Sequence, residues 1–263
     1  MLQITVIDAF TDEPFKGNPA AVCITDTPLS DKLMQNIAAE MNLSETAFLV
    51  PLATGVWSLR WFTPAIEVDI CGHATLASAH LLWEQRGITS DTVLHFRTLI
   101  GELRAQKVSN LIELNFPSVV PKPIHFGDDV SKALGAAPLY SGKEGLFILF
   151  ELDSAETVRN LNPDLKTLVK LGAEDFIVCA RSDDSKFDIV SRCFAPGAGI
   201  DEDPVTGSAH CTLAPYWAPK LGKNVLRCYQ ASKRGGVIEA ELKGDRVLLR
   251  GQARTVLSGE MLI

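Results

Sequence analysis

Two segments about half a chain apart carry the same arrangement of residues that could bind an anion. Residues 61–75 and residues 193–211 both contain Phe-x-Pro, then acidic residues, then Gly followed by His or Ser and by Ala. Each segment leads into an apolar stretch typical of a helix, whose first N–H groups have no partner within it. Gly72 and Gly207 lack a Cβ, so a ligand carboxylate can approach those amides closely. The pattern predicts two anion-binding helix starts, although a capped helix after an acidic loop would explain either copy alone.

Glu45 is the first candidate for acid/base chemistry. It follows Ser44 in a short connection between an expected helix over residues 29–41 and an apolar strand that begins near Thr46. Such a carboxylate is partly removed from water, which favours its protonated form and lets it accept and return a proton. The alternative is an ordinary glutamate in a solvated loop.

His73 and Asp203 are the other candidate catalytic residues. The helix dipole disfavours a charged imidazole in the first turn, so we expect His73 to be a neutral hydrogen-bonding group or a purely structural histidine. Asp203 precedes a proline and could orient His73 or a substrate amine, with an Asx-turn or helix cap as the alternative. The candidate substrate-binding residues are Asn18, Ser44, Gly72, Thr206, Gly207 and Ser208.

Other chemistries fit the sequence poorly. It contains no Gly-x-Gly-x-x-Gly after a strand, no Walker loop and no Gly-x-Ser-x-Gly. His73 and His80 are seven residues apart on one expected helix, too far to share a metal ion, and His210 has no spaced partner. We therefore expect neither a metal nor a cofactor. Two helix starts would supply donors for the enolate-like charge of a proton transfer.

The remaining pattern predicts strands that outnumber helices. Strands are expected over residues 2–10, 20–24, 57–62, 92–96, 101–106, 111–116, 145–152, 175–180 and 187–194, with several more after residue 225. Helices are expected over residues 29–41, with Ser30 as N-cap, from 72 to 87, and over 130–134, 155–161 and 164–171. A last helix from Gly207 towards Gly222 would be disturbed by Pro215 and Pro219. Gly17 and Asn18 can take positive φ, and residues 117–123 are the best candidate linker.

Composition excludes several classes of protein. The 263 residues are 46% apolar, which is ample for a core, and the net charge of −7 argues against a nucleic-acid or membrane-surface partner. Six dispersed cysteines are expected to be structural thiols. No apolar run reaches transmembrane length, and Met1 leads straight into a strand pattern, so we expect a cytoplasmic protein without a signal peptide.

The repeat predicts two related lobes. We expect an α+β protein whose first lobe covers residues 1–117 and whose second covers residues 118–263, with the last strand able to return to the first lobe. In each lobe a mixed sheet would wrap around the apolar helix of the repeat. The two helix starts could then face each other across a cleft.

These residues also resemble the PhzF-like phenazine biosynthesis family. The match runs through almost the whole chain, in the segments Asp8-Ala-Phe10, Phe15-Lys-Gly-Asn-Pro19, Ser44-Glu-Thr-Ala-Phe48, Phe62-Thr-Pro64, Cys71-Gly-His-Ala-Thr75, Phe194-Ala-Pro196, Asp201-Glu-Asp-Pro-Val-Thr-Gly-Ser-Ala209 and Gln230-Ala-Ser-Lys-Arg-Gly-Gly236. The resemblance implies a diaminopimelate epimerase-like fold with the active site between two similar lobes. It also implies a cofactor-independent enzyme that forms a homodimer.

The resemblance assigns roles to individual residues. It places the family's catalytic glutamate at Glu45, its cleft histidine at His73 and its aspartate at Asp203. The ligand-binding helix starts correspond to Gly72, Gly207 and Ser208. By this resemblance, Glu45 would take a proton from one carbon of a small carboxylate-containing substrate and return it to another carbon of the same molecule.

Two departures keep other functions open. Epimerases of this fold use a cysteine from each lobe; Cys71 matches the first position, but the second falls near Val205, and Cys211 lies too far along its helix to replace it. Phenazine-forming members have proline where this chain has Ala74, which argues against the phenazine precursor as substrate. Three hypotheses follow: an isomerase using Glu45, an amino-acid epimerase or racemase using Cys71, and a non-catalytic metabolite-binding protein.

Overall fold

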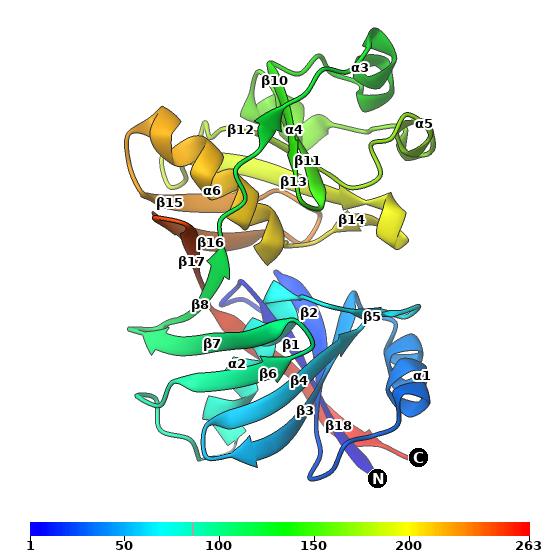
Figure 1. Cartoon of the computed structure of the whole chain (residues 1–263), viewed down its shortest axis with the longest axis vertical. Coiled ribbons are helices and arrows are strands. Elements are labelled where there is room, and N and C mark those ends of the chain that lie inside the picture. Colours follow the sequence, from blue (N-terminus) through cyan, green and yellow to red (C-terminus); the bar gives the residue numbers. More distant parts are fainter. Residues whose placement is uncertain (86) are drawn as a thin grey trace. The chain divides into compact units, whose positions relative to one another are not determined.

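The chain forms two compact units (Figure 1), in a computed structural model that describes residues 1–85 and 87–263. The first unit comprises Met1–Phe116 and Leu249–Ile263, and the second comprises Pro117–Leu248. The C-terminal strand β18 (Ala253–Met261) thus belongs with the first unit, where it pairs antiparallel with β1 (Leu2–Ala9). Across the described ranges, every helix is too short or too polar to span a membrane.

In the residues that the structure describes, the first unit consists of a mixed sheet and two helices. Its other strands are β2 (Asn18–Ile24), β3 (Glu45–Ala53), β4 (Val56–Phe62), β5 (Glu67–Val68), β6 (Leu94–Thr98), β7 (Gly101–Val108) and β8 (Leu111–Pro117), and its helices are α1 (Asp31–Met41) and α2 (Gly72–Gln85). Strand β2 pairs antiparallel with β1 and parallel with β3, which pairs antiparallel with β4. Strand β4 pairs antiparallel with β5 and parallel with β6, which is followed by antiparallel β7 and β8.

The second unit has the same kinds of element. Its strands are β9 (Lys122–Pro123), β10 (Tyr140–Glu144), β11 (Phe147–Glu151), β12 (Phe176–Arg181), β13 (Ile189–Ala195), β14 (Ile200–Asp203), β15 (Val225–Gln230), β16 (Gly236–Lys243) and β17 (Arg246–Gly251), the last of which ends in the first unit. Its helices are α3 (Asp128–Leu134), α4 (Ala155–Asn160), α5 (Leu165–Lys170), α6 (Gly207–Leu221) and the short 3₁₀ helix η1 (Pro196–Ala198). Helices α3, α4 and α5 pack their apolar residues against β11, β12 and β13.

The sequence repeat corresponds to a repeated strand topology. In the second unit β10, β11, β12 and β13 pair in the order antiparallel, parallel, antiparallel, as β1 to β4 do in the first. Strand β13 then pairs antiparallel with the short β14 and, beyond helix α6, parallel with β15, as β4 does with β5 and β6. This arrangement confirms the predicted α+β class with a mixed sheet and one long apolar helix in each unit.

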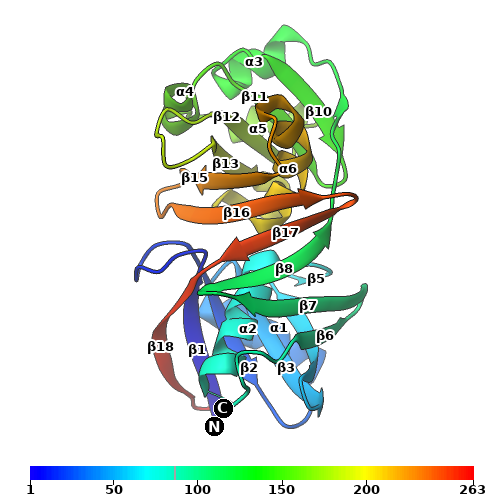
Figure 2. The same cartoon turned by 90° about the vertical axis from the view of Figure 1, so that its left-hand side faces the viewer.

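Helices α2 and α6 are buried on nearly all sides. Helix α2 packs against β1, β2, β3 and β18, and α6 packs against β11, β15 and β16 (Figure 2). A helix that is apolar all round can be stable only in such a position. The buried hydroxyl groups of Thr75 and Ser78 donate to the carbonyl oxygens four residues earlier, those of Cys71 just before the helix and of Ala74 within it.

The expected disturbance of the second apolar helix is wrong. Helix α6 runs without interruption through Pro215 and Pro219. Proline has no N–H, so Pro215 leaves the carbonyl oxygen of Cys211 without its usual helical donor. The N–H of Val119 donates to that oxygen at 2.9 Å, which replaces the missing bond.

Several local predictions are confirmed and others are corrected. Ser30 caps α1 by accepting the Leu33 N–H, and Asn42 ends the helix in the left-handed conformation. In the turn before β2, positive φ occurs at Gly17 and at Phe15, whereas Asn18 already belongs to the strand.

The remaining differences concern element bounds. Strand β3 begins at Glu45, one residue earlier than expected; β10 was not predicted; and the acidic segment before α6 forms η1 and β14 instead of an open loop. The expected linker over residues 117–123 contains β9. The last described residue of α2 is Gln85, and residue 86 of the expected helix lies outside the described residues.

Candidate active site

Glu45 and His73 lie side by side in the first unit. Glu45 is the first residue of β3 and stands opposite Ala20 of β2, while His73 is the second residue of α2, which packs against both strands. The Nε2 atom of His73 is 3.2 Å from Oε2 of Glu45, and the side chains are 5% and 15% exposed. This close contact is not aligned as a hydrogen bond. The fold therefore places a largely buried carboxylate against an imidazole.

The imidazole of His73 is neutral at physiological pH. Burial lowers the pKa of His73 to about 3, because a charged ring would lose its hydration there. The helix dipole also predicts a neutral His73 from the sequence, but the cause of the lowered pKa is desolvation of the buried ring. A neutral ring donates from one nitrogen and accepts at the other, so His73 can hydrogen-bond a substrate or Glu45 in either protonation state.

Cys71 joins this pair from the residue before α2. Its Sγ lies 3.5 Å from Nδ1 of His73, and the residue is 5% exposed. One ligand atom from each of Glu45, Cys71 and His73 falls within 4.8 Å of the other two. The sequence showed Cys71 and His73 as neighbours, but only the packing of α2 on β3 brings Glu45 to them. These three side chains together could hold a metal ion.

The other predicted residues of the first unit lie at or just before the starts of strands β2 and β3 and of helix α2. Asn18 is the first residue of β2, opposite Ala9 of β1, and it is fully buried. Ser44 is partly buried and directly precedes Glu45, and Gly72 is the buried first residue of α2. Strand β2, strand β3 and helix α2 thus begin with the residues that the sequence singled out.

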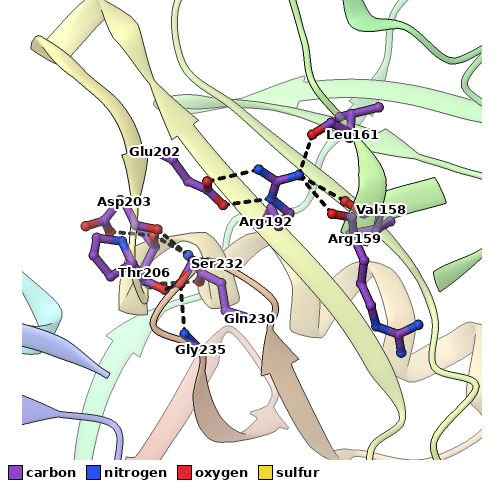
Figure 3. A network of polar contacts seen from close by, with 11 residues as sticks. Val158, Arg159, Leu161, Arg192, Glu202, Asp203, Thr206, Gln230, Ser232 and Gly235 are labelled. Atoms are coloured by element: carbon purple, nitrogen blue, oxygen red, sulfur yellow. Dashed lines mark hydrogen bonds and ion pairs between the residues drawn. The ribbon is translucent and has the colours of Figure 1, made fainter. Parts of the chain in front are cut away.

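In the second unit, Gln230 holds the segment before α6 in place (Figure 3). Gln230 is 1% exposed. Its side-chain carbonyl accepts the Thr206 N–H at 2.8 Å, and its side-chain amide donates to the Asp203 carbonyl oxygen at 2.8 Å and to Thr206 Oγ1 at 3.1 Å. Ser232 adds a bond from its hydroxyl to the Pro204 carbonyl oxygen at 2.7 Å and accepts the Gly235 N–H at 3.1 Å. The residues before the helix are therefore fixed on several sides.

This network leaves the start of α6 without a side-chain cap. Thr206 is the N-cap residue, but its hydroxyl donates to Oδ2 of Asp203 at 2.5 Å and makes no capping bond. The N–H groups of the first helical turn therefore receive no hydrogen bond acceptor from the Thr206 side chain. Such N–H groups can bind an anion. Gly207, at the first helical position, is buried, and Ser208 is partly buried. Asp203 lies in this unit and His73 in the other, so a role for Asp203 in orienting His73 remains a proposal.

Arg192 anchors the short strand that ends at Asp203. Its guanidinium pairs with both carboxylate oxygens of Glu202 at 2.7 and 2.9 Å, and the two side chains are 12% and 23% exposed. The same group donates to the Leu161 carbonyl oxygen at 2.6 Å, near the end of α4 (Figure 3). It also lies over the Phe194 ring. Strand β14 is thereby tied to both β13 and α4.

Two further ionisable groups of α6, His210 and Cys211, are buried. Burial lowers the pKa of His210 to about 4, and its Nδ1 lies 2.8 Å from the Thr206 carbonyl oxygen. Burial raises the pKa of Cys211 to about 12, and its thiol points at the Gly207 carbonyl oxygen at 3.8 Å. Cys211 is thus poorly suited to act as a thiolate.

Sequence reasoning assigned no role to Gln230, Ser232 or Arg192. The first two belong to a segment that resembled the family, which was the only available signal. Arg192 lies in an apolar strand next to Cys193, where a charged residue flanked by buried ones could have suggested a pairing. Its partner Glu202 stood in the acidic run before α6, with nothing to distinguish it from its neighbours.

The two units share a repeated α+β topology; the first holds the largely buried Glu45–His73 pair, and the second holds a helix start without a side-chain cap. Residues 7–259 match the family described as phenazine biosynthesis-like protein. The chain therefore belongs to the phenazine biosynthesis-like family.

Several relatives are similar over their whole length. An isomerase of Halalkalibacterium halodurans, named as uncharacterized, is 51% identical over 261 residues, which cover 99% of this chain and 98% of that protein. The human phenazine biosynthesis-like domain-containing protein is 39% identical over 285 residues, with 99% of each chain covered. The crystal structure of a PhzF-family protein from Enterococcus faecalis has a TM-score of 0.95 and 41% identity, covering 100% of this chain and 99% of that one.

More distant structures share the fold alone. A probable proline racemase from Agrobacterium radiobacter, solved with bound carbonate, has a TM-score of 0.69 at 12% identity, covering 100% of this chain and 93% of that one. The fold is thus the one shared by PhzF-family proteins and this racemase. The relatives named as isomerases and the PhzF-family structure support an isomerase type of enzyme.

Proposed function

We propose that this protein is a cofactor-independent isomerase that moves a proton between carbons of a small carboxylate-containing substrate, with Glu45 as acid and base. The observation that carries the proposal is the buried contact between the Glu45 carboxylate and neutral His73. A carboxylate that must accept a proton and then release it again works best where partial burial favours its protonated form. A neutral imidazole does not hold the carboxylate in its charged form, as a lysine or arginine would.

The starts of α2 and α6 are the proposed binding positions for the substrate carboxylate and for the negative charge that develops during proton transfer. The start of α6 supports this role, because the Thr206 hydroxyl donates to Asp203 and makes no capping bond to the first turn of the helix. Asp203, held by that hydroxyl, is proposed to orient His73 or a substrate amine. Further proposed substrate contacts are Asn18, Ser44 and Gly72.

Cofactor independence belongs to the same proposal. Moving a proton requires a base, a return path to the second carbon and donors for transient negative charge, and the side chains and amides described above can supply all three. Turnover is therefore expected to persist after exhaustive dialysis against a chelator. Assembly into a homodimer is a prediction that rests on the family resemblance.

A second candidate function is an amino-acid epimerase or racemase that uses Cys71. The observation in its favour is the position of the Cys71 thiol, 3.5 Å from His73. A paired-thiol mechanism needs a second cysteine for the opposite face of the substrate. The second position falls near Val205, and Cys211 is buried with a raised pKa and points back at its own helix. These observations favour Glu45 over a thiol pair.

The proposal can be tested by screening carboxylic acids and amino acids in D2O with NMR detection of deuterium incorporation. The isomerase hypothesis expects label at a new carbon position and a product that differs from the substrate. Exchange at an α-carbon that persists in Cys71→Ser would rule out the epimerase. A non-catalytic binding protein would show ligands by thermal shift, yet no label would enter any of them.

A further inference from the structure

Glu45, Cys71 and His73 offer a mixed set of metal ligands. The three side chains present a carboxylate oxygen, a sulfur and an imidazole nitrogen, and all three residues are largely buried. Among residues 1–85 and 87–263, this is the only group of three such side chains with ligand atoms within 4.8 Å of one another. Hard cations such as Mg²⁺ prefer oxygen ligands, whereas sulfur and imidazole favour Zn²⁺.

Two of the distances in this group equal or approach those between the ligands of a tetrahedral zinc ion, and they run to different ring nitrogens of His73. Zinc binds sulfur at about 2.3 Å and nitrogen or oxygen at about 2.0–2.1 Å, so ligand atoms in a tetrahedron stand roughly 3.3–3.6 Å apart. The Sγ of Cys71 is 3.5 Å from Nδ1 of His73, and Oε2 of Glu45 is 3.2 Å from Nε2. A single ion would bind only one ring nitrogen of His73, so the side chain that faces the other nitrogen, the Cys71 thiol or the Glu45 carboxylate, has to move. The three ligand atoms lie within 4.8 Å of one another, so a movement of about 1 Å brings them to tetrahedral distances.

Such a shift is within reach of the side chains involved. Glu45 has three side-chain torsions at the beginning of a strand, and the thiol of Cys71 can turn about its single χ1 torsion. His73 is fixed by the helix and its burial, so it provides the stationary ligand. A water molecule would complete the tetrahedron, as in zinc sites with three protein ligands.

We propose that Glu45, Cys71 and His73 bind one Zn²⁺ ion, and that this ion reversibly inhibits the enzyme by occupying the carboxylate that carries the proton. The inhibitory half of this inference rests on the proposed function, whereas the metal site does not. Zinc would convert a base that cycles between two protonation states into a permanent ligand, because a carboxylate bound to the metal is held deprotonated. The inhibition would be relieved by a chelator and would not be reproduced by Mg²⁺ at the same concentration.

Binding can be measured without substrate by titrating the full chain with Co²⁺ and then displacing it with Zn²⁺. We expect one Co²⁺ per chain and a near-ultraviolet charge-transfer band that reports a thiolate ligand. The band should disappear in Cys71→Ala and should require at least tenfold more Co²⁺ in Glu45→Gln. The matched control is Cys23→Ala, which removes another buried thiol of the same unit and should leave the band unchanged.

Zinc X-ray absorption on the unaltered protein keeps the proposal testable if a variant fails to fold. One sulfur and two or more nitrogen or oxygen ligands are expected; a sulfur-free zinc shell, or a cobalt band that survives in Cys71→Ala, would overturn the site. Binding with one sulfur but without loss of turnover would overturn the inhibitory role. If zinc binds as expected while Glu45→Gln still incorporates deuterium into substrate, the proposed function fails and the metal site stands.

Discussion

Replacing Gln230 by leucine should destabilise the segment before α6 by about 2–6 kcal/mol. The substitution removes the partners of two backbone groups, the Thr206 N–H and the Asp203 carbonyl, each bonded at 2.8 Å to a side chain that is 1% exposed. A buried backbone group that loses its partner costs about 1–3 kcal/mol, and two such groups give the stated range. Leucine is close to glutamine in size, so a cavity contributes little.

The assay combines urea unfolding, for the global free energy, with hydrogen exchange of the peptide that contains Thr206, for the local one. Protection of that peptide should fall at least about 25-fold, since 1.4 kcal/mol corresponds to a factor of ten. Gln3→Leu is the matched control, because Gln3 makes one exposed bond to Glu260 and its loss should change stability by no more than about 0.5 kcal/mol. Equal effects of the two substitutions would refute the role given to Gln230.

Three further predictions concern the supports of the candidate site. Arg192→Met should lower the free energy of unfolding in urea by about 2–4 kcal/mol, because it leaves the largely buried carboxylate of Glu202 without its ion-pair partner. Arg159→Met breaks a more exposed ion pair and should lower it by less than about 1 kcal/mol. Similar values for the two variants would contradict this prediction. Gly17→Ala should lower the melting temperature far more than Gly244→Ala. The two glycines have nearly the same φ, 64° and 63°, but a Cβ at Gly17 would lie 2.1 Å from the Ala9 carbonyl oxygen, whereas a Cβ at Gly244 would meet nothing within 4 Å. Burial lowers the pKa of His210 from 6.5 to about 4, so the native state binds fewer protons than the unfolded state between these two pH values. The free energy of unfolding should therefore fall as the pH drops through this window, by up to about 1.4 kcal/mol per pH unit. His210→Gln should flatten this slope, and an unchanged slope would count against a neutral buried ring.

The parts of the fold that follow local rules could be predicted from the sequence. Ser30 and Asn42 mark the ends of α1 because capping and left-handed geometry depend on residues close in the chain. The apolar helices after Gly72 and Gly207 were visible because their composition leaves no polar face to meet water. The repeat identified α2 and α6 as corresponding helices of the two units, because both follow the same local pattern of residues.

The parts that depend on distant partners could not be predicted. Helix α6 passes through Pro215, and Val119, far away in the sequence, donates to the carbonyl oxygen that this proline leaves without its helical donor. The grouping of Glu45 with Cys71 requires the packing of a helix on a strand, which no spacing along the chain reveals. Gln230 and its role likewise depend on hydrogen bonds across 24 or more residues. Local patterns predicted candidate residues, and tertiary contacts decided which of them meet.

The most direct test of the central claim is the transfer of deuterium by Glu45→Gln. Glutamine keeps the size and the acceptor oxygen of the side chain but cannot carry the proton, so solvent deuterium incorporation into a substrate found by screening should fall by at least about 100-fold, while ligand binding is kept. Glu40→Gln, at an exposed position of α1, is the control and should retain full incorporation. Incorporation by Glu45→Gln at the rate of the unaltered protein would contradict the assignment of Glu45 as the proton carrier.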